Sequence, residues 1–209
     1  MKDAVDQPTA VGFIDGQNLF MQAKRLLGHR IPNFDPVALH REMCEVAGFR
    51  PGAVRFYTGM PSARRQPRWH AFWCNKTQAM ERDGVEVTTR PLRYRKRRIF
   101  DEEGDVEMIM QAEEKGIDIR IALDLVRLAR RGELDAAIIY SQDQDLNEVV
   151  SEVEAIGKIR STQIKLASAF VTGPDADFDR GIRGTQWLRF DKCIYDRCID
   201  GRNYFPKES

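Results

Sequence analysis

Apolar residues along the chain follow two patterns that alternate. Short continuous apolar runs have the length of buried strands, and the longer stretches between them carry apolar side chains every three or four residues, as one face of a helix does. The predicted strands cover residues 11–14, 53–58, 85–89, 136–140 and 164–170. The predicted helices cover residues 18–27, 35–47, 68–82, 117–129 and 146–156, and a shorter one falls near residues 190–199. This alternation predicts an α/β fold in which helices cover the faces of a mostly parallel sheet.

One stretch interrupts this pattern. Residues 90–98 hold six positive charges and no acid, and residues 101–107 then hold five acids. Adjacent blocks of opposite charge are typical of solvated chain, so we expect an exposed excursion here and not a buried strand.

Length and composition exclude several classes of protein. The 209 residues fit one domain, 42% of them are hydrophobic, and no apolar run is long enough to cross a membrane. Acids near the N-terminus do not fit a signal peptide, and the four scattered cysteines form no CxxC pair. We therefore expect a globular protein in the reducing cytoplasm, without a membrane partner.

Charge is distributed unevenly along the chain. The formal net charge is +1, but residues 1–100 carry an excess of nine positive charges and residues 101–209 an excess of eight negative charges. This asymmetry indicates a charged ligand.

Acidic and amide side chains follow two of the predicted strands. Asp15 and Asn18 come after residues 11–14, Asp143 and Asp145 come after residues 136–140, and Asp118 begins the helix of residues 117–129. In open α/β sheets, ligands bind outside the carboxyl ends of the strands. A single such acid is often only a turn or helix cap, but capping does not require two.

Paired carboxylates are accommodated by a divalent cation. Oxygen ligands without nearby His or Cys favour Mg²⁺ or Mn²⁺, and these ions can activate water for attack on a phosphate. None of the three histidines, at positions 29, 40 and 70, is close in sequence to the acids, which argues against nucleophilic catalysis with a histidine base.

Three short motifs carry a family resemblance. They are residues 13–18 (FIDGQN), residues 114–118 (EKGID) followed by 122–125 (ALDL), and residues 141–145 (SQDQD). At these residues the chain resembles the NYN family of PIN-like nucleases, which includes LabA-type bacterial proteins, over roughly residues 10–170. The resemblance implies a three-layer α/β/α, Rossmann-like fold whose acids bind Mg²⁺ or Mn²⁺ and hydrolyse RNA.

The resemblance also implies an organisation of the chain. Residues 1–9 would be an N-terminal tail, residues 10–172 the PIN-like nuclease domain, and residues 173–209 a C-terminal extension packed on it. Dimerisation through that extension is a further expectation.

Site residues are assigned by their positions in these motifs. The resemblance implies that the metal is bound by Asp15, Asp118 and Asp143, with Asp145 as a fourth acid. Asn18 would orient Asp15 or a substrate phosphate, which completes the expected catalytic set. Glu114 and Asp124 also match family positions. Six residues separate Asp124 from Asp118, about 600° of helix, so both cannot face one pocket and we expect Asp124 to be structural.

The chain departs from the family pattern at Gln142, Gln144 and Leu146, where glycine, a small residue and phenylalanine are usual. No acid is lost, so the main expectation is a metal-dependent ribonuclease, acting as an endonuclease. One alternative is a weakly active or inactive RNA-binding or regulatory scaffold with the same fold. Another is a hydrolase of small phosphate compounds or nucleotides that uses the same acids.

Basic side chains are the expected complement of an acidic site, because they can hold the phosphates of RNA beside it. The expected RNA-binding residues are Arg93, Tyr94, Arg95, Arg97, Arg98 and Lys115. Simple pairing of the basic block with the acidic block remains an alternative. A second candidate patch combines Arg64, Arg65 and Arg68 with Trp69 and Trp73.

Overall fold

A computed structural model describes residues 7–100, 106–174, 176 and 180–207, without the side chains of Phe100 and Val106. In this part of the chain one sheet has the strand order β3-β2-β1-β6-β7-β8, and all of its neighbouring strands are parallel. Its strands are β1 (Thr9–Asp15), β2 (Arg50–Met60), β3 (Glu86–Pro91), β6 (Ala136–Tyr140), β7 (Lys165–Val171) and β8 (Gln186–Phe190). The predicted α/β fold with a mostly parallel sheet is confirmed.

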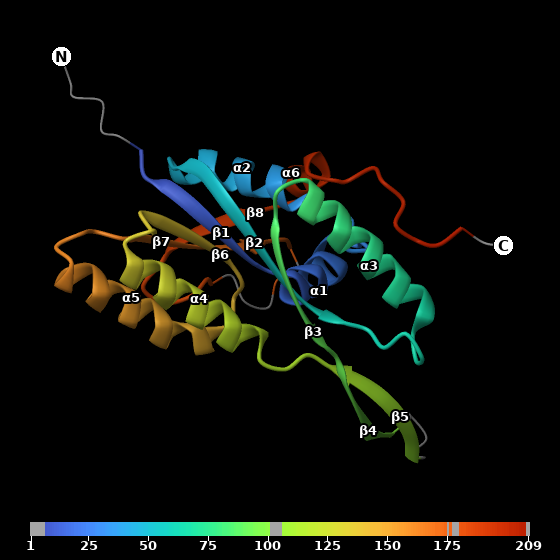
Figure 1. Cartoon of the computed structure of the whole chain (residues 1–209). Helices are drawn as coiled ribbons and strands as arrows, with labels where there is room; N and C mark the ends of the chain where they lie inside the picture. The colour runs from blue at the N-terminus through green and yellow to red at the C-terminus, as the bar shows by residue number, and fades with distance from the viewer. Residues whose placement is uncertain (1–6, 101–105, 175, 177–179, 208–209) are drawn as a thin grey trace.

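Helices cover both faces of this sheet, which gives three layers (Figure 1). One face packs against α1 (Gly16–Leu27), α2 (Pro36–Ala47), α3 (Pro67–Arg82) and α6 (Lys192–Arg197). The other packs against α4 (Ile117–Arg131) and α5 (Asn147–Ile159), which follows the 3₁₀ turn η1 (Gln144–Leu146). Strand β6 is buried along its whole length because helices cover it on both sides, and this explains its uninterrupted apolar sequence.

The strand order determines where a ligand can bind. From β1 the chain continues to β2 and β3 on one side, and β6, β7 and β8 later extend the sheet on the other side. The order therefore reverses between β1 and β6. In doubly wound α/β folds the crevice outside the carboxyl ends of the strands at such a reversal is the usual binding site. Asp15 ends β1, and residues 141–143 follow β6 at the same edge.

The basic excursion is a β-hairpin. Strands β4 (Arg93–Phe100) and β5 (Val106–Glu113) pair antiparallel and project away from the main sheet (Figure 1). The predicted exposure is confirmed for the arginines of β4, which are all exposed. The strands themselves were not predicted, because charged residues on a two-stranded ribbon leave no apolar signal. Most of the acidic block, residues 101–105, lies outside the described residues.

Strand β8 was also not predicted. It lies at the edge of the sheet, where Gln186, Trp187 and Arg189 are exposed and only Leu188 and Phe190 are buried. It therefore lacks the continuous apolar run that marks a central strand of a parallel sheet. The boundary expected at residue 172 stays a prediction, and β7 and β8 on its two sides belong to one sheet.

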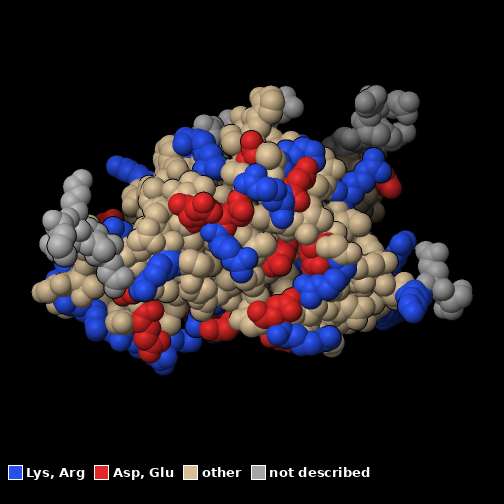
Figure 2. Space-filling view, turned by 90° about the horizontal axis from the view of Figure 1, so that it is seen from above, with Lys and Arg blue, Asp and Glu red and all other residues tan. Residues whose placement is uncertain are grey.

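Two surface properties can be read from the described residues. Their helices are all too short or too polar to cross a lipid bilayer. Basic and acidic side chains are interspersed on the face shown in Figure 2, whereas the sequence of β4 is almost uniformly basic.

A buried carboxylate joins α4 to the sheet. Asp124 is 1% exposed and accepts hydrogen bonds from Tyr57 Oη of β2 at 3.1 Å, Arg120 Nε at 3.0 Å and Arg127 Nη1 at 3.2 Å. These contacts agree with the structural position expected for Asp124. They also fix the helix whose first turn carries Asp118.

We predict that Asp124→Ala lowers the free energy of unfolding by about 2 to 4 kcal/mol, because the buried Tyr57 hydroxyl loses its acceptor and the ion pairs are broken. The matched control is Arg127→Ala. This removes a side chain that is 49% exposed, and we expect a loss below about 1 kcal/mol. Urea unfolding measures both, and equal losses would contradict the proposed role of Asp124.

Candidate active site

Asp15 lies at the base of the candidate site. It ends β1 and caps α1, because its Oδ1 accepts a hydrogen bond from Asn18 N at 2.9 Å. The next residue must be small: a Cβ on Gly16 would lie 2.3 Å from Cζ of the Phe56 ring. The chain can therefore turn directly from the strand into the helix, which leaves Asp15 9% exposed at the carboxyl edge of the sheet.

Acids from separate segments share the space beside Asp15. A pocket of about 710 Å³ is lined by Asp15 and Asn18, by Glu114 between β5 and α4, and by Asp143 after β6. A second pocket of about 270 Å³ contains Asp15, Glu114 and Asp143 again and adds Lys115 and Asp118. We call these four acids, Asp15, Glu114, Asp118 and Asp143, the acidic cluster.

The turn before α4 brings two members of the cluster to the same place. Gly116 has a φ of 81°, in the left-handed region that glycine adopts without strain. This turn separates Glu114 from Asp118, and the two acids nevertheless line the same small pocket.

Burial and mutual repulsion change the acidity of the cluster. Burial, together with the charges of Asp143 and Asp118, raises the pKa of Asp15 to about 6, although backbone hydrogen bonds from Asn18 and Gln17 oppose the change. Burial and, to a smaller extent, the charge of Asp15 raise the pKa of Glu114 to about 8, although a backbone hydrogen bond from Gly59 opposes the change. The Oε2 atom of Glu114 is buried without a hydrogen-bond partner. The surroundings of the cluster thus disfavour the ionised forms of Asp15 and Glu114.

The cluster is not a closed metal site. In the part of the chain that the structure describes, no three Asp, Glu, His or Cys side chains are arranged to hold one ion. The donors are nevertheless suited to a hard cation, since they are all carboxylates and one buried oxygen is unpaired.

The structure places Asn18 and Asp145 in different roles from the cluster. Asn18 lines the larger pocket, and its Oδ1 accepts a hydrogen bond from Gln22 Nε2, while Gln22 Oε1 accepts one from Val171 N of β7. Asp145 is exposed and lines neither pocket. Its backbone N–H donates to Asp143 Oδ1 at 2.9 Å, so residue 145 contributes to the position of Asp143 through the main chain.

Gln142 and Gln144 bind the segment before β8. Gln142 Nε2 donates to the carbonyl oxygen of Arg180 at 3.0 Å, and Gln144 Nε2 donates to that of Gly181 at 3.2 Å. Of the two, only Gln142 lines the larger pocket. The two glutamines that depart from the family pattern therefore connect the loop that carries Asp143 to the C-terminal part of the chain.

The basic residues of β4 alternate between the two faces of the hairpin. Opposed residues of an antiparallel pair share a face. Arg93 is opposite Glu113 and Arg95 is opposite Gln111, and both Glu113 and Gln111 line the larger pocket. Arg97 lies on the same face and donates to Gln111 Oε1 at 2.9 Å. Lys96 and Arg98 alternate with these residues and lie on the opposite face.

Tyr94 positions the hairpin. Its hydroxyl accepts a hydrogen bond from Ser62 N at 2.9 Å, and the guanidinium of Arg65 lies over its ring, 5.2 Å from the centroid. Tyr94, one of the expected RNA-binding residues, is therefore engaged with residues 62–65. The other aromatic side chain of β4, Phe100, lies outside the described side chains.

Glu114 is the member of the cluster that the sequence did not place in the site. Its family position was visible, but its environment was not, because burial and the charge of Asp15 act on it only in three dimensions. The signal in the sequence was an acid next to the glycine turn that precedes the helix carrying Asp118.

A parallel, doubly wound sheet with acids at its reversal point defines a Rossmann-like α/β domain with a candidate hydrolytic site. The family model of the NYN domain matches residues 9–170, and the chain belongs to this family. The resemblance seen in the sequence is confirmed, and an NYN domain suggests a nuclease-type function on RNA.

Among solved structures, a protein of unknown function from Vibrio parahaemolyticus is similar. The identity is 19%, the alignment covers 90% of this chain and 96% of that chain, and the TM-score is 0.46. No curated protein matches this chain.

The raised pKa values predict a pH dependence of stability in the absence of metal. Between about pH 4 and pH 8 the folded protein holds protons on Asp15 and Glu114 that the unfolded chain releases. The free energy of unfolding therefore falls as pH rises through this range.

Glu114→Gln should remove part of this fall. In EDTA we expect the variant to exceed wild type in unfolding free energy by about 1 kcal/mol or more near pH 9, and by much less near pH 4.5. Urea unfolding at both pH values measures the difference. The control Glu113→Gln changes the neighbouring acid, whose side chain is 43% exposed and pairs with Arg95, and should leave the slope close to that of wild type.

Proposed function

We propose that the protein is a ribonuclease that uses Mg²⁺ or Mn²⁺ to hydrolyse phosphodiester bonds within RNA strands. The observation that carries this proposal is the acidic cluster: four carboxyl groups from three segments of the chain line one pocket at the reversal point of the sheet. Two of them have pKa values raised by burial and by their neighbours. A divalent cation would relieve that repulsion. The scattered free cysteines support a cytoplasmic setting.

Asp15, Asp118 and Asp143 would hold the metal, with Glu114 beside them. When bound, a divalent ion neutralises phosphate charge and lowers the pKa of water. Mg²⁺ keeps several of its waters and is often bound through only one or two carboxylates. Among the described residues no three such side chains are arranged to hold one ion directly, so an ion that keeps most of its waters would suit the cluster better than a fully coordinated one.

Other side chains of the pocket have supporting roles. Asn18, whose amide oxygen is held by Gln22, orients the α1 side of the pocket. Glu114 has a pKa of about 8, so it can hold or release a proton at its carboxyl group near neutral pH. Lys115 is exposed at the rim of the smaller pocket, where its ammonium group can bind a phosphate.

The hairpin supports RNA as the substrate. Arg93, Arg95 and Arg97 share a face of the hairpin with Gln111 and Glu113, which line the larger pocket. Cations beside an acidic centre keep a polyanion close to groups that would otherwise repel it. Pairing within the hairpin, as between Arg95 Nε and Glu113 Oε2 at 3.5 Å, occupies an arginine only at an exposed site, where RNA phosphate can replace the carboxylate.

A second candidate function is RNA binding without catalysis. It is favoured by the absence, among the described residues, of three acids arranged around one ion. The two functions differ in whether metal binding depends on Asp15 and Asp143.

The cleavage test uses labelled RNA with Mn²⁺. We expect Asp143→Asn to lower kcat/KM by about 100-fold or more, because it removes a carboxylate of the cluster, and EDTA to abolish cleavage. Asp145→Asn is the matched control. It changes an exposed acid two residues away, and its backbone bond to Asp143 remains, so we expect a change of only a few fold. If wild type and Asp143→Asn cleave alike, the enzymatic proposal fails.

Isothermal titration with Mn²⁺ separates the enzyme from the scaffold. We expect wild type to bind Mn²⁺, and Asp15→Asn and Asp143→Asn to bind at least about 10-fold more weakly, because each loses a negatively charged oxygen donor. Binding that is identical in all three proteins, or missing in wild type, would favour the scaffold.

The hairpin prediction concerns the salt dependence of RNA affinity. Replacing Arg95 and Arg97 by Gln should reduce the slope of log affinity against log salt by about 1 to 1.5, since each lost phosphate contact accounts for about 0.7 on a single strand. Filter binding at several salt concentrations with Asp143→Asn in all proteins measures this slope. The control replaces Lys96 and Arg98, two cations on the opposite face. If the control reduced the slope equally, RNA would be attracted by the overall charge of the hairpin and not by contacts on one of its faces.

A further inference from the structure

A second, mostly apolar pocket adjoins the larger pocket of the candidate site. It has a volume of about 190 Å³ and is walled by Phe20, Pro61, Trp69, Trp73 and Leu92. We call it the aromatic pocket. Gln17 and Met21 of α1 line both this pocket and the one that contains Asp15, so the two spaces are neighbours.

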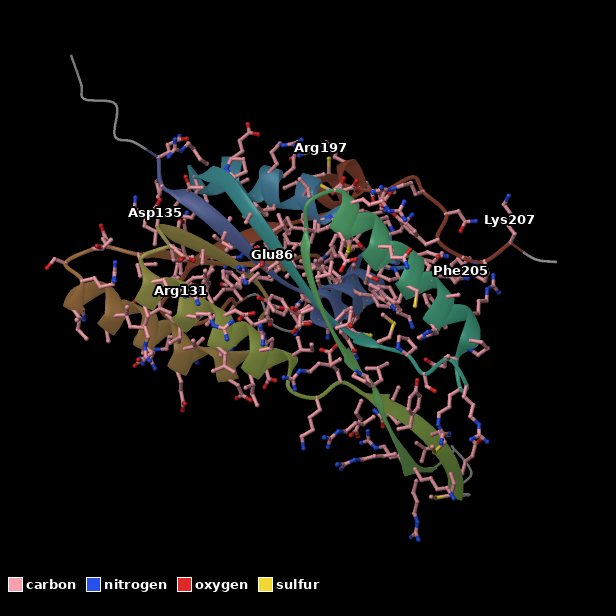
Figure 3. All side chains as sticks on the ribbon, in the orientation of Figure 1. Glu86, Arg131, Asp135, Arg197, Phe205 and Lys207 are labelled. Atoms are coloured by element: carbon pink, nitrogen blue, oxygen red, sulfur yellow. The ribbon has the colours of Figure 1, made fainter. Side chains whose placement is uncertain are left out.

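The walls of the aromatic pocket are held in place by ring contacts. Trp69 meets the rings of Phe72 and Phe205 at centroid distances of 5.4 and 5.3 Å, both edge to face. Phe205 comes from the C-terminal segment, which lies beside α3 (Figure 3). Trp73 is 7% exposed and packs on Phe56. A ligand would therefore find a surface that is already ordered, which reduces the entropy cost of binding.

The charges around this pocket are opposite to those of the acidic cluster. Arg65 lies over the ring of Tyr94, and Arg68 lies over the ring of Phe205 at 4.8 Å. Both arginines are exposed. Arg68 is thus separated from the wall residue Trp69 by a single ring, because Phe205 contacts both of them. Gln17 and Gln66 add amide groups to the lining.

These features select one kind of ligand. A flat ring system fits apolar and aromatic walls, amides can read its polar edge, and cations can bind phosphates attached to it. The volume is below the range of about 300 to 1,000 Å³ that holds drug-sized ligands. It suits a single base and excludes a base pair.

We infer that the aromatic pocket binds one unpaired nucleobase of the RNA whose neighbouring phosphate lies at the acidic cluster. This inference rests on the proposed function and adds to it a separate binding site for one base of the substrate. A base inside a continuous duplex could not enter the pocket without leaving its stack. The patch of arginines and tryptophans noted in the sequence then belongs to the same RNA path as the hairpin.

The first test scans a single-stranded RNA with one abasic nucleotide at each position in turn. We expect one position next to the cleaved bond at which loss of the base lowers kcat/KM about 5- to 100-fold, in keeping with stacking of one base on an aromatic side chain. Trp69→Ala should lower cleavage of the intact RNA by a similar factor and make the protein insensitive to the abasic nucleotide. Trp69→Phe should keep most of the base dependence. The same sequence in a perfect duplex should be cleaved at least about 10-fold more slowly.

Thermal unfolding of each variant shows whether the fold is kept. If Trp69→Ala does not fold, Leu92→Trp serves instead, because it fills the pocket from another wall and leaves the ring contacts of Trp69 in place. It should also abolish the base dependence. The inference is overturned if every abasic substrate is cleaved like the intact RNA. It is also overturned if the abasic nucleotide lowers kcat/KM of the pocket variants by the same factor as it lowers that of wild type.

A binding measurement separates failure of this inference from failure of the proposed function. Trp187→Phe removes the tryptophan on β8 and leaves Trp69 and Trp73 as the fluorescent residues. We expect a tetranucleotide RNA to quench this fluorescence without metal, and its fully abasic analogue to have an effect at least about 5-fold weaker. Base-dependent quenching without any cleavage would support the pocket and contradict the ribonuclease. Cleavage with neither quenching nor abasic sensitivity would contradict the pocket alone, and the absence of both signals would contradict both.

Discussion

Repulsion among the carboxylates around Asp15 is the constraint on which the candidate site depends. Asp15 is nearly buried, and Glu114, Asp118 and Asp143 lie around the same small pocket. A fold gains nothing in stability from this arrangement, because burial and like charge both disfavour the ionised forms. Clusters of this kind are characteristic of sites where a cation or a proton is handled. The structural elements nearby are accordingly those that hold the acids close despite their repulsion.

Three local devices hold them. The backbone of Asn18 donates a hydrogen bond to Asp15, the main chain of residue 145 does the same for Asp143, and the glycine turn at residue 116 lets Glu114 and Asp118 face one pocket. Asp124 then fixes α4 to β2 through Tyr57 and thereby fixes the first turn of the helix. Each of these contacts either stabilises the charge of one carboxylate or orders part of the backbone. None of them provides a hydrogen-bond partner for Glu114 Oε2.

The surfaces next to the acidic cluster carry different kinds of side chain. The hairpin supplies cations on the face that it shares with two residues of the larger pocket, and the aromatic pocket supplies flat apolar walls beyond Gln17 and Met21. Phosphate, metal and base would each meet a separate set of side chains. Tyr94 connects two of these sets, because it belongs to the hairpin and bonds to the segment that precedes α3.

The sequence by itself determined the α/β class, most strands and helices of the main sheet, the family, and the acids Asp15, Asp118 and Asp143. It could do so because buried strands and amphipathic helices leave periodic apolar patterns, and because Asp15 and Asp143 follow directly on predicted strands while Asp118 lies at the start of a predicted helix. Tertiary structure decided what those patterns cannot carry. The strands of the hairpin and β8 have exposed faces and little apolar signal. The burial that raises the pKa of Glu114, the exclusion of Asp145 from the pockets, and the meeting of Trp69 with Phe205 all depend on residues far apart in the chain. Local sequence does not encode such contacts, because solvent exclusion and charge proximity arise only when distant segments pack together.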